Sequence, residues 1–137
     1  MNPYSALDQY QSVKLQGQVA TSPNHGLVSL LLDRILEKIA HANGAIERGD
    51  VAARGNAISD AIRIVDNLRA GLNKAQGGDV AANLQGLYDY IEKRLVEANA
   101  KADLTALTEV ASLIAEIKSG WDGISEVVNN GNASSKN

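Results

Sequence analysis

The distribution of proline is the feature that most constrains how this chain folds. The chain has only two prolines, Pro3 and Pro23, and residues 24–137 contain none. Because proline removes a backbone N–H and interrupts helices, its absence permits long helices throughout this region. Apolar residues recur there every three or four positions, which is the spacing of a helix face. A chain of 137 residues is one domain in length, and the pattern predicts an all-α fold.

Helix start and stop signals divide this region into four predicted helices. The first begins near Ser22, where Thr21-Ser22-Pro23 combines an N-cap with proline at the first helical position. It ends at Gly49, and Asp50 caps the second helix, which runs from residue 51 to about residue 73. The fourth begins near residue 103 and ends at about residue 128.

The third predicted helix lies in residues 77–100 and organises the others. Gly77 and Gly78 can take positive φ and end the preceding segment, and Asp79 supplies the next N-cap. The helix has one narrow apolar face, and Tyr88 lies at its edge. The members of that face are Val80, Leu84, Leu87, Ile91, Leu95 and Ala98. The opposite face places Asp89 four residues before Lys93 and Glu97 four before Lys101, which predicts two ion pairs.

Short connections make consecutive helices antiparallel neighbours. The sequence therefore predicts an antiparallel up-down-up-down four-helix bundle with a short N-terminal arm. Residues 1–21 form the arm, which is either mobile or docked, and residues 22–128 form the bundle. Residues 129–137 are rich in Asn, Ser and Gly and are expected to be a disordered tail.

The apolar faces differ in width between the helices. The narrow face of the third helix is expected to be used up in the bundle, which leaves Tyr90 and Val96 as its spare contacts. The second and fourth helices have wider faces, and two interpretations remain open: an irregular bundle buries the surplus, or the surplus forms a groove for another amphipathic helix. The candidate groove residues are Ala57, Ile64, Leu68, Leu113, Ile117 and Ile124.

Composition argues against several classes of function. The chain has no cysteine, a net charge of −3 and 4% aromatic residues, which disfavours thiol chemistry and nucleic acid as the main partner. It has no apolar run of about 20 residues and no signal peptide, so we expect a cytoplasmic protein that does not insert into a membrane.

The two histidines are the candidate reactive or metal-binding groups of this chain. Di-iron bundles need inward Glu-x-x-His pairs, but Glu37 and His41 are four residues apart, and no inward carboxylate is evident on the other helices. A phosphotransfer domain with His41 as the reactive group is the other alternative, although the Lys and Gly usual after such a histidine are here Ala42, Asn43 and Gly44. We expect His25 and His41 to be solvated surface residues, and we predict no enzyme activity, no metal and no cofactor.

One protein family shares the most distinctive sequence motif of this chain. Gly-Gly-Asp-Val-Ala-Ala-Asn-Leu-Gln-Gly-Leu-Tyr-Asp-Tyr-Ile at residues 77–91, followed by Arg-Leu-Val-Glu-Ala-Asn at 94–99, resembles FliS, the flagellin-specific export chaperone family. The likeness extends in order over residues 4–124. Two positions depart from the family pattern: Leu32-Asp33 stands where the family often has Tyr-Asp, and Asp60 stands where it often has Lys. These departures concern details of contact.

The resemblance implies a cytoplasmic binding protein with two partners. One is the C-terminal segment of unassembled flagellin, which would be kept from premature polymerisation. The other is the cytoplasmic domain of the flagellar export gate, to which the cargo would be delivered. We expect the arm, with Leu7 and Tyr10, to cover the empty groove until cargo displaces it. The resemblance adds that the arm residues Tyr4, Leu7 and Tyr10 then contact the export gate. A helical adaptor or secretion chaperone for another substrate, and a structural bundle that dimerises through the same surface, remain as alternatives.

Overall fold

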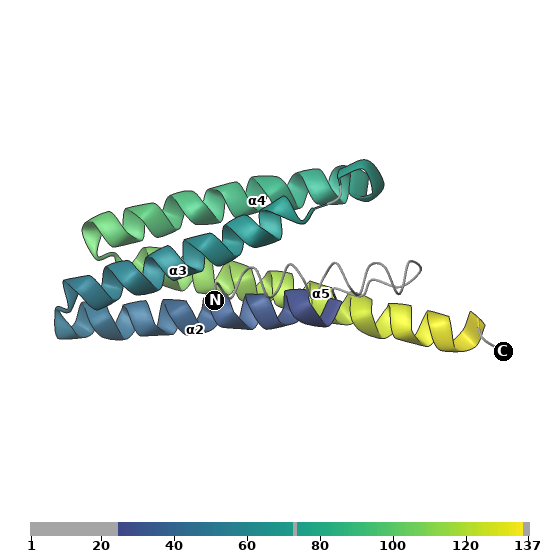
Figure 1. Ribbon diagram of the computed structural model, residues 1–137, viewed down its shortest axis with the longest axis horizontal. Coiled ribbons are helices and arrows are strands. Elements are labelled where there is room, and N and C mark those ends of the chain that lie inside the picture. Colours follow the sequence, from purple (N-terminus) through teal and green to yellow (C-terminus); the bar gives the residue numbers. More distant parts are fainter. Residues whose placement is uncertain (1–24, 73, 136–137) are drawn as a thin grey trace, which may run out of the picture.

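Four helices make up the part of the chain that the structure describes. The computed structural model describes residues 25–72 and 74–135, and Figure 1 shows the four helices. The helices are α2 (His25–Arg48), α3 (Val51–Ala70), α4 (Lys74–Lys101) and α5 (Leu104–Ser135). The described residues include no strand, which confirms the predicted all-α fold.

The helices pack in chain order around a closed ring. Contacts join α2 to α3, α3 to α4, α4 to α5, and α5 back to α2. Each helix runs antiparallel to the one before it (Figure 1). This arrangement is the predicted up-down-up-down bundle.

The connection between α2 and α3 has the predicted two residues. Gly49 has φ 71°, and its N–H bonds to the carbonyl of Ile46, while the N–H of Asp50 bonds to the carbonyl of Ala45. These two bonds satisfy carbonyls at the end of α2, and positive φ costs glycine little. The Asp50 carboxylate then accepts a hydrogen bond from the N–H of Ala53 at 3.0 Å and caps α3.

The connection between α4 and α5 repeats this design without glycine. Ala102 has φ 51°, and the N–H of Asp103 bonds to the carbonyl of Ala98 at 3.1 Å. The Asp103 carboxylate accepts hydrogen bonds from the N–H groups of Thr105 and Ala106. An alanine in the left-handed region is unusual, so the bundle holds this turn against the local preference of the backbone.

Gly78, the second of the two glycines before the third predicted helix, interrupts the helical backbone. Gly78 has φ 55° and ψ −127°, which is not helical, so α4 has a kink at this residue. The positive φ expected for this pair is therefore confirmed at Gly78. A β-carbon would be strained in this conformation, which explains why the position needs glycine.

Two helix ends differ from the sequence prediction. Helix α3 ends at Ala70, before the expected end near residue 73, because Gly71 stops it and its N–H bonds to the carbonyls of Arg69 and Asn67. Helix α5 continues beyond Val128 to Ser135. Residues 129–135, expected to be disordered, are thus part of a helix, since neither proline nor a capping break follows Val128.

The core lies along the bundle axis and takes residues from all four helices. Its large side chains are almost completely buried: Leu32, Ile35, Ile58, Val65, Ile91, Leu95, Leu107, Val110 and Ile114. Tyr88 is 3% exposed and belongs to this core, and burial raises the pKa of its hydroxyl to about 12. Burial of each such apolar side chain stabilises the fold by about 1.5–3 kcal/mol before entropy is counted.

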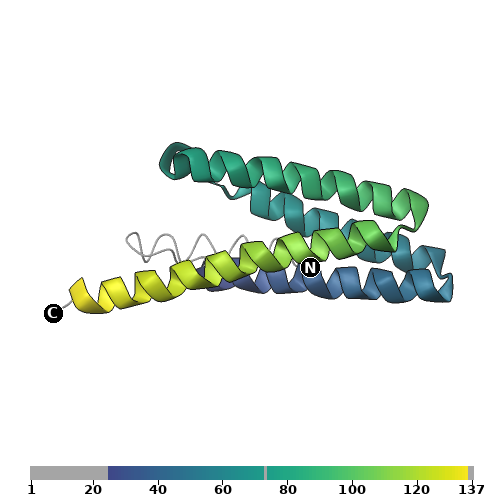
Figure 2. The ribbon, with the colours of Figure 1, turned by 180° about the vertical axis from the view of Figure 1, so that it is seen from behind.

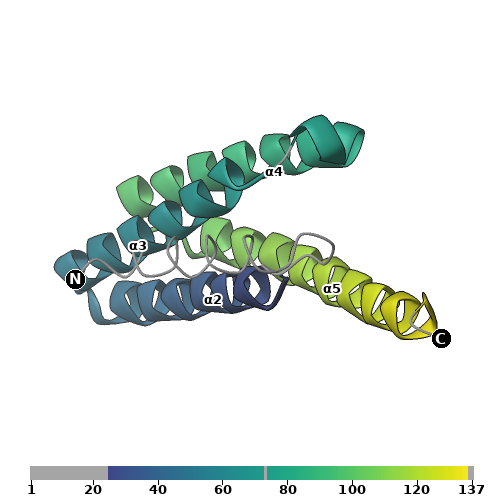
Figure 3. The ribbon, with the colours of Figure 1, turned by 45° about the vertical axis from the view of Figure 1, so that its right-hand side comes forward.

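The bundle is tight at one end and splayed at the other. Helices α4 and α5 meet at Ala102–Asp103 and separate toward the start of α4, as Figures 2 and 3 show. In the same views the last part of α5 extends past the first turn of α2.

Candidate partner-binding surface

Helices α4 and α5 each carry half-buried apolar side chains. They are Leu84 and Leu87 on α4 and Leu113 and Ile117 on α5, and we call this set the α4–α5 strip. All four pack against the core while keeping part of their surface open. Val80, near the start of α4, is 66% exposed. The strip lies where the two helices separate, which is why its residues are not fully buried.

The sequence predicted surplus apolar surface on the second and fourth helices, but part of the open apolar surface lies on α4. The face of the third predicted helix was expected to be used up in the bundle, but Leu84 and Leu87 are only half-buried. The physical reason is the splay, because a complete seam requires α5 to stay beside α4 along its whole length. Tyr90 and Val96 are exposed as expected, at 41% and 58%.

The six predicted groove residues fall into three groups. Ala57, Ile64 and Leu68 on α3 are buried in the core, and Ile64 is only 2% exposed. Leu113 and Ile117 on α5 are half-buried and belong to the α4–α5 strip. The side chain of Ile124 lies outside the described residues. That these residues contact a partner stays a prediction.

A cluster of polar residues joins α4 to α5 on the side of the strip nearer their connection. The Tyr90 hydroxyl donates to Glu109 Oε2 at 2.9 Å, and Arg94 Nε donates to Glu109 Oε1 at 2.6 Å. Arg94 also bonds to Glu97 at 2.7 Å. The hydrogen bonds from Arg94, and then from Tyr90, lower the pKa of Glu109 below its ordinary value. The cluster keeps the two helices together here and sets one boundary of the strip.

A stacked pair of rings joins the first turn of α2 to α5. The ring centroids of His25 and Trp121 are 4.4 Å apart and their planes are 14° from parallel. The Trp121 indole N–H donates to the carbonyl oxygen of His25 at 2.8 Å, and His25 Nε2 lies 2.7 Å from the carbonyl oxygen of Trp121. Next to this pair, the Ser29 hydroxyl donates to Asp122 at 2.9 Å. These contacts fix α5 at the splayed end of the bundle.

This arrangement corrects the expectation for His25. His25 is half-buried and paired with Trp121, so it is not a solvated surface residue. On a helical wheel, position 25 lies beside the apolar face that includes Leu32 and Leu36. This position is the signal that could have predicted the buried contact of His25. Trp121 is half-buried and packs against the core.

The other histidine matches the expected surface position. His41 is exposed, and so is Glu37 four residues before it. Within the part of the chain that the structure describes, no three histidine or carboxylate side chains gather as they would around a metal ion.

An ionic cluster between α3 and α4 was not predicted. Arg69 on α3 pairs with Asp66 in its own helix and with Asp89 and Glu92 on α4, the last two at 2.6 and 3.0 Å. Asp89 therefore pairs across helices with Arg69, whereas the sequence predicted a pair with Lys93. Likewise, Glu97 pairs with Arg94 and not with Lys101. Spacing within one helix does not show which helix lies beside it, so these partners could not be read from sequence.

Glu92 is the member of this cluster with the most perturbed acidity. Burial of its carboxyl group is the main cause, and a hydrogen bond with Asp66 adds to it, so the pKa of Glu92 rises to about 7. Arg69 acts in the opposite direction without overcoming these effects. In the described part of the chain, Glu92 Oε1 is buried and has no hydrogen-bond partner.

Comparison with known proteins assigns the family. The family model described as "Flagellar protein FliS" matches residues 6–128. The chain belongs to the FliS family. The flagellar secretion chaperone FliSB of Pseudomonas aeruginosa is 45% identical over 125 residues, which cover 91% of this chain and 99% of that protein. The flagellar secretion chaperone FliS of Salmonella typhimurium is 39% identical over 122 residues, 88% of this chain and 90% of that protein.

A more distant FliS-family relative matches over a similar length. The flagellar secretion chaperone FliS of Bacillus subtilis is 32% identical over 120 residues, which are 88% of this chain and 84% of that protein. The FliS match includes most of the predicted arm, although Tyr4, Leu7 and Tyr10 lie outside the described residues. None of the helices in residues 25–72 and 74–135 is apolar over a length sufficient to cross a bilayer.

Proposed function

We propose that this protein is a cytoplasmic secretion chaperone for flagellin. It binds the C-terminal segment of unassembled flagellin, prevents premature polymerisation and delivers the subunit to the cytoplasmic domain of the flagellar export gate. The observation that carries this proposal is membership of the FliS family along most of the chain, together with relatives that are named flagellar secretion chaperones. The role needs binding alone, so it requires no catalytic residue and no cofactor.

The α4–α5 strip is the surface that we assign to the flagellin segment. A segment that folds on binding loses conformational entropy and must recover it by burying apolar surface. Leu84, Leu87, Leu113 and Ile117 supply that surface, since all four have area left to bury. The Arg94–Glu109–Tyr90 cluster beside them offers polar contacts at the rim of the strip. An apolar centre with a polar edge is the usual composition of a binding surface.

Ala57, Ile64 and Leu68 have a secondary place in this proposal. They are buried in the free protein, so a partner reaches them only if the packing of α3 opens. We therefore place the first contacts of flagellin on α5, at Leu113 and Ile117.

The arm completes the proposal. An empty apolar surface promotes aggregation, so a removable cover is useful to a chaperone that waits for cargo. We propose that the arm, through Leu7 and Tyr10, covers the groove until flagellin displaces it, and that Tyr4, Leu7 and Tyr10 then face the export gate. Amide exchange of residues 4–15 should be faster in the flagellin complex than in the free protein. Equal exchange rates in the two states would contradict the cover.

The flagellin assignment is tested by mixing the protein with full-length flagellin and with flagellin that lacks its C-terminal segment. A one-to-one complex in size-exclusion chromatography is expected with the former alone. Equal binding to both would place the contact elsewhere on flagellin. Binding to neither would favour a chaperone for another secretion substrate.

The position of the site is tested by charged substitutions. Ile117→Asp should weaken flagellin binding at least tenfold while circular dichroism stays unchanged, because Ile117 is half-buried and the carboxylate can reach water. Ile64→Asp, at a residue 2% exposed, should instead unfold the bundle. Val96→Asp is the matched control, since Val96 is an exposed apolar residue outside the strip. Normal binding by folded Ile117→Asp would move the site away from α5.

A further inference from the structure

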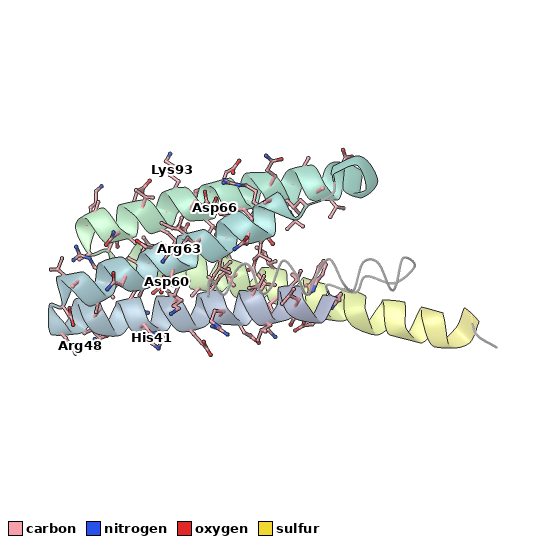
Figure 4. All side chains as sticks on the ribbon, viewed as in Figure 1. His41, Arg48, Asp60, Arg63, Asp66 and Lys93 are labelled. Carbon is pink, nitrogen blue, oxygen red and sulfur yellow. The ribbon has the colours of Figure 1, made fainter. Side chains whose placement is uncertain are left out.

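A second surface, on the opposite pair of helices, carries basic side chains. A groove follows the junction of α2 and α3 and is separate from the α4–α5 strip. Lys38, His41, Gly44 and Arg48 line it from α2, and Ala53 and Asp60 are among the residues that line it from α3. Figure 4 shows His41 and Arg48 along the same edge of α2. The groove therefore has a basic side and a side of small and polar residues.

The charges in the groove are not equally available. Asp60 is already paired with Lys38 at 3.2 Å and with Arg63. His41 and Arg48 are both exposed, and in the described part of the chain neither forms an ion pair. The acidic group of the groove is thus neutralised from within α2 and α3, which leaves an imidazole and a guanidinium to bind a partner. This local excess of hydrogen-bond donors and positive charge contrasts with the net charge of −3 for the chain.

Gly44 gives the groove its shape. It lies between His41 and Arg48 on the same side of α2, and a Cβ placed there would stand 3.0 Å from Arg48 Nη1. The missing side chain lets the Arg48 guanidinium lie along the helix and leaves a notch in the surface. Ala53 faces the notch from α3, so both walls are low and a partner backbone can approach closely.

The spacing of the two donors identifies the kind of partner. His41 and Arg48 are seven residues apart, which is about 10 Å along a helix at about 1.5 Å per residue. Acidic residues seven apart on a second helix repeat this distance and point to one side of that helix. We propose that the α2–α3 groove is a docking site for an acidic helix of a partner protein, with carboxylates two turns apart that bind His41 and Arg48.

Nucleic acid fits this groove less well than an acidic helix. Phosphates in a nucleic acid backbone are closely spaced and need a run of basic residues. Here the groove offers His41 and Arg48 in place of a run of basic residues, and Glu37 and Glu47 are exposed on the same helix. A partner helix with two carboxylates and otherwise small side chains would bind His41 and Arg48. It would place no further negative charge beside Glu37 and Glu47.

The probe for this site is an alanine-based helical peptide with glutamates at two positions seven residues apart. Its matched partner carries glutamines at the same positions. Titration of the isotope-labelled protein, followed by amide chemical shifts, should show saturable shifts at Gly44, Arg48 and Ala53 with the glutamate peptide alone. Added salt should reduce them, because exposed charge pairs are screened.

Two variants test the groove, and a third serves as the control. Arg48→Gln should weaken the glutamate peptide about two- to fivefold, the range expected for one exposed charge pair. Gly44→Leu should abolish binding by filling the notch, and it should fold, because a helical glycine is replaced by a better helix former and its Cβ meets only the Arg48 side chain. Arg34→Gln, an exposed α2 arginine outside the groove, is the control and should bind normally.

Three results would overturn the site: equal shifts with the glutamine peptide, shifts confined to other helices, or normal binding by Gly44→Leu. None of them bears on flagellin binding at the α4–α5 strip, which Ile117→Asp tests separately.

Discussion

Replacing Glu92 with glutamine should remove a pH dependence of stability that the fold creates. Glu92 has a pKa of about 7 in the folded protein, against an ordinary value of 4.5, mainly because it is buried and also because it shares a hydrogen bond with Asp66. A carboxyl group with a raised folded pKa binds protons more tightly when folded. Its contribution to stability is therefore full below about pH 4.5 and is lost as the pH rises through about 7.

The size of the effect follows from the shift. A shift from 4.5 to about 7, at about 1.4 kcal/mol per unit, sets an upper limit of about 3 kcal/mol. The Glu92 side chain is 18% exposed, so solvent screens part of this effect and we expect about 1–3 kcal/mol. Glutamine keeps the shape and does not titrate. The substitution replaces one of the two carboxylate oxygens, of which Oε1 is buried without a hydrogen-bond partner in the described part of the chain.

The assay is urea unfolding of the wild type and of Glu92→Gln, followed by circular dichroism between about pH 5 and about pH 8. The free energy of unfolding of the variant minus that of the wild type should increase by about 1–3 kcal/mol across this range. Asp89→Asn removes another α4 carboxylate that contacts Arg69 and is the matched control, which should keep the wild-type slope. A difference for Glu92→Gln that stays constant with pH would refute the reasoning.

Two further substitutions test the ends of the helices. Asp50→Ala removes the cap of α3 and should lower the free energy of unfolding by about 1 kcal/mol, whereas Asp50→Asn should keep most of it; equal losses would show that the cap hydrogen bond contributes nothing. Trp121→Phe keeps an aromatic ring against His25 but removes the indole N–H bond, and should cost about 1 kcal/mol in urea unfolding. An unchanged unfolding midpoint for Trp121→Phe would mean that the ring contact alone holds α5.

The ends of the helices were predicted best where a local backbone rule applies. Gly49 and Asp50 act within a few residues of each other, so their positive φ and cap could be read from sequence. The end of α5 was missed, because Asn, Ser and Gly lower helix propensity without forbidding a helix.

Pairing between helices was predicted less well. Arg69 and Glu109 each bond to residues of a neighbouring helix, and His25 stacks on Trp121, whose position is 96 residues further along the chain. Such contacts depend on the rotation and crossing of two helices, which the spacing within one helix does not specify. The candidate site was affected in the same way, since half of its predicted members are buried on α3.

The sequence by itself determined the class of fold, the order of the helices and the family. Proline confined to positions 3 and 23, together with apolar spacing of three and four, already implied four long helices. Which apolar residues stay open was decided by the tertiary structure alone. Leu84 and Leu87 belong to a face narrow enough to be buried entirely, yet they remain half-buried because α4 separates from α5 at that end. The amount of apolar surface is set by residue spacing within a helix, whereas its exposure is set by the distance to the next helix.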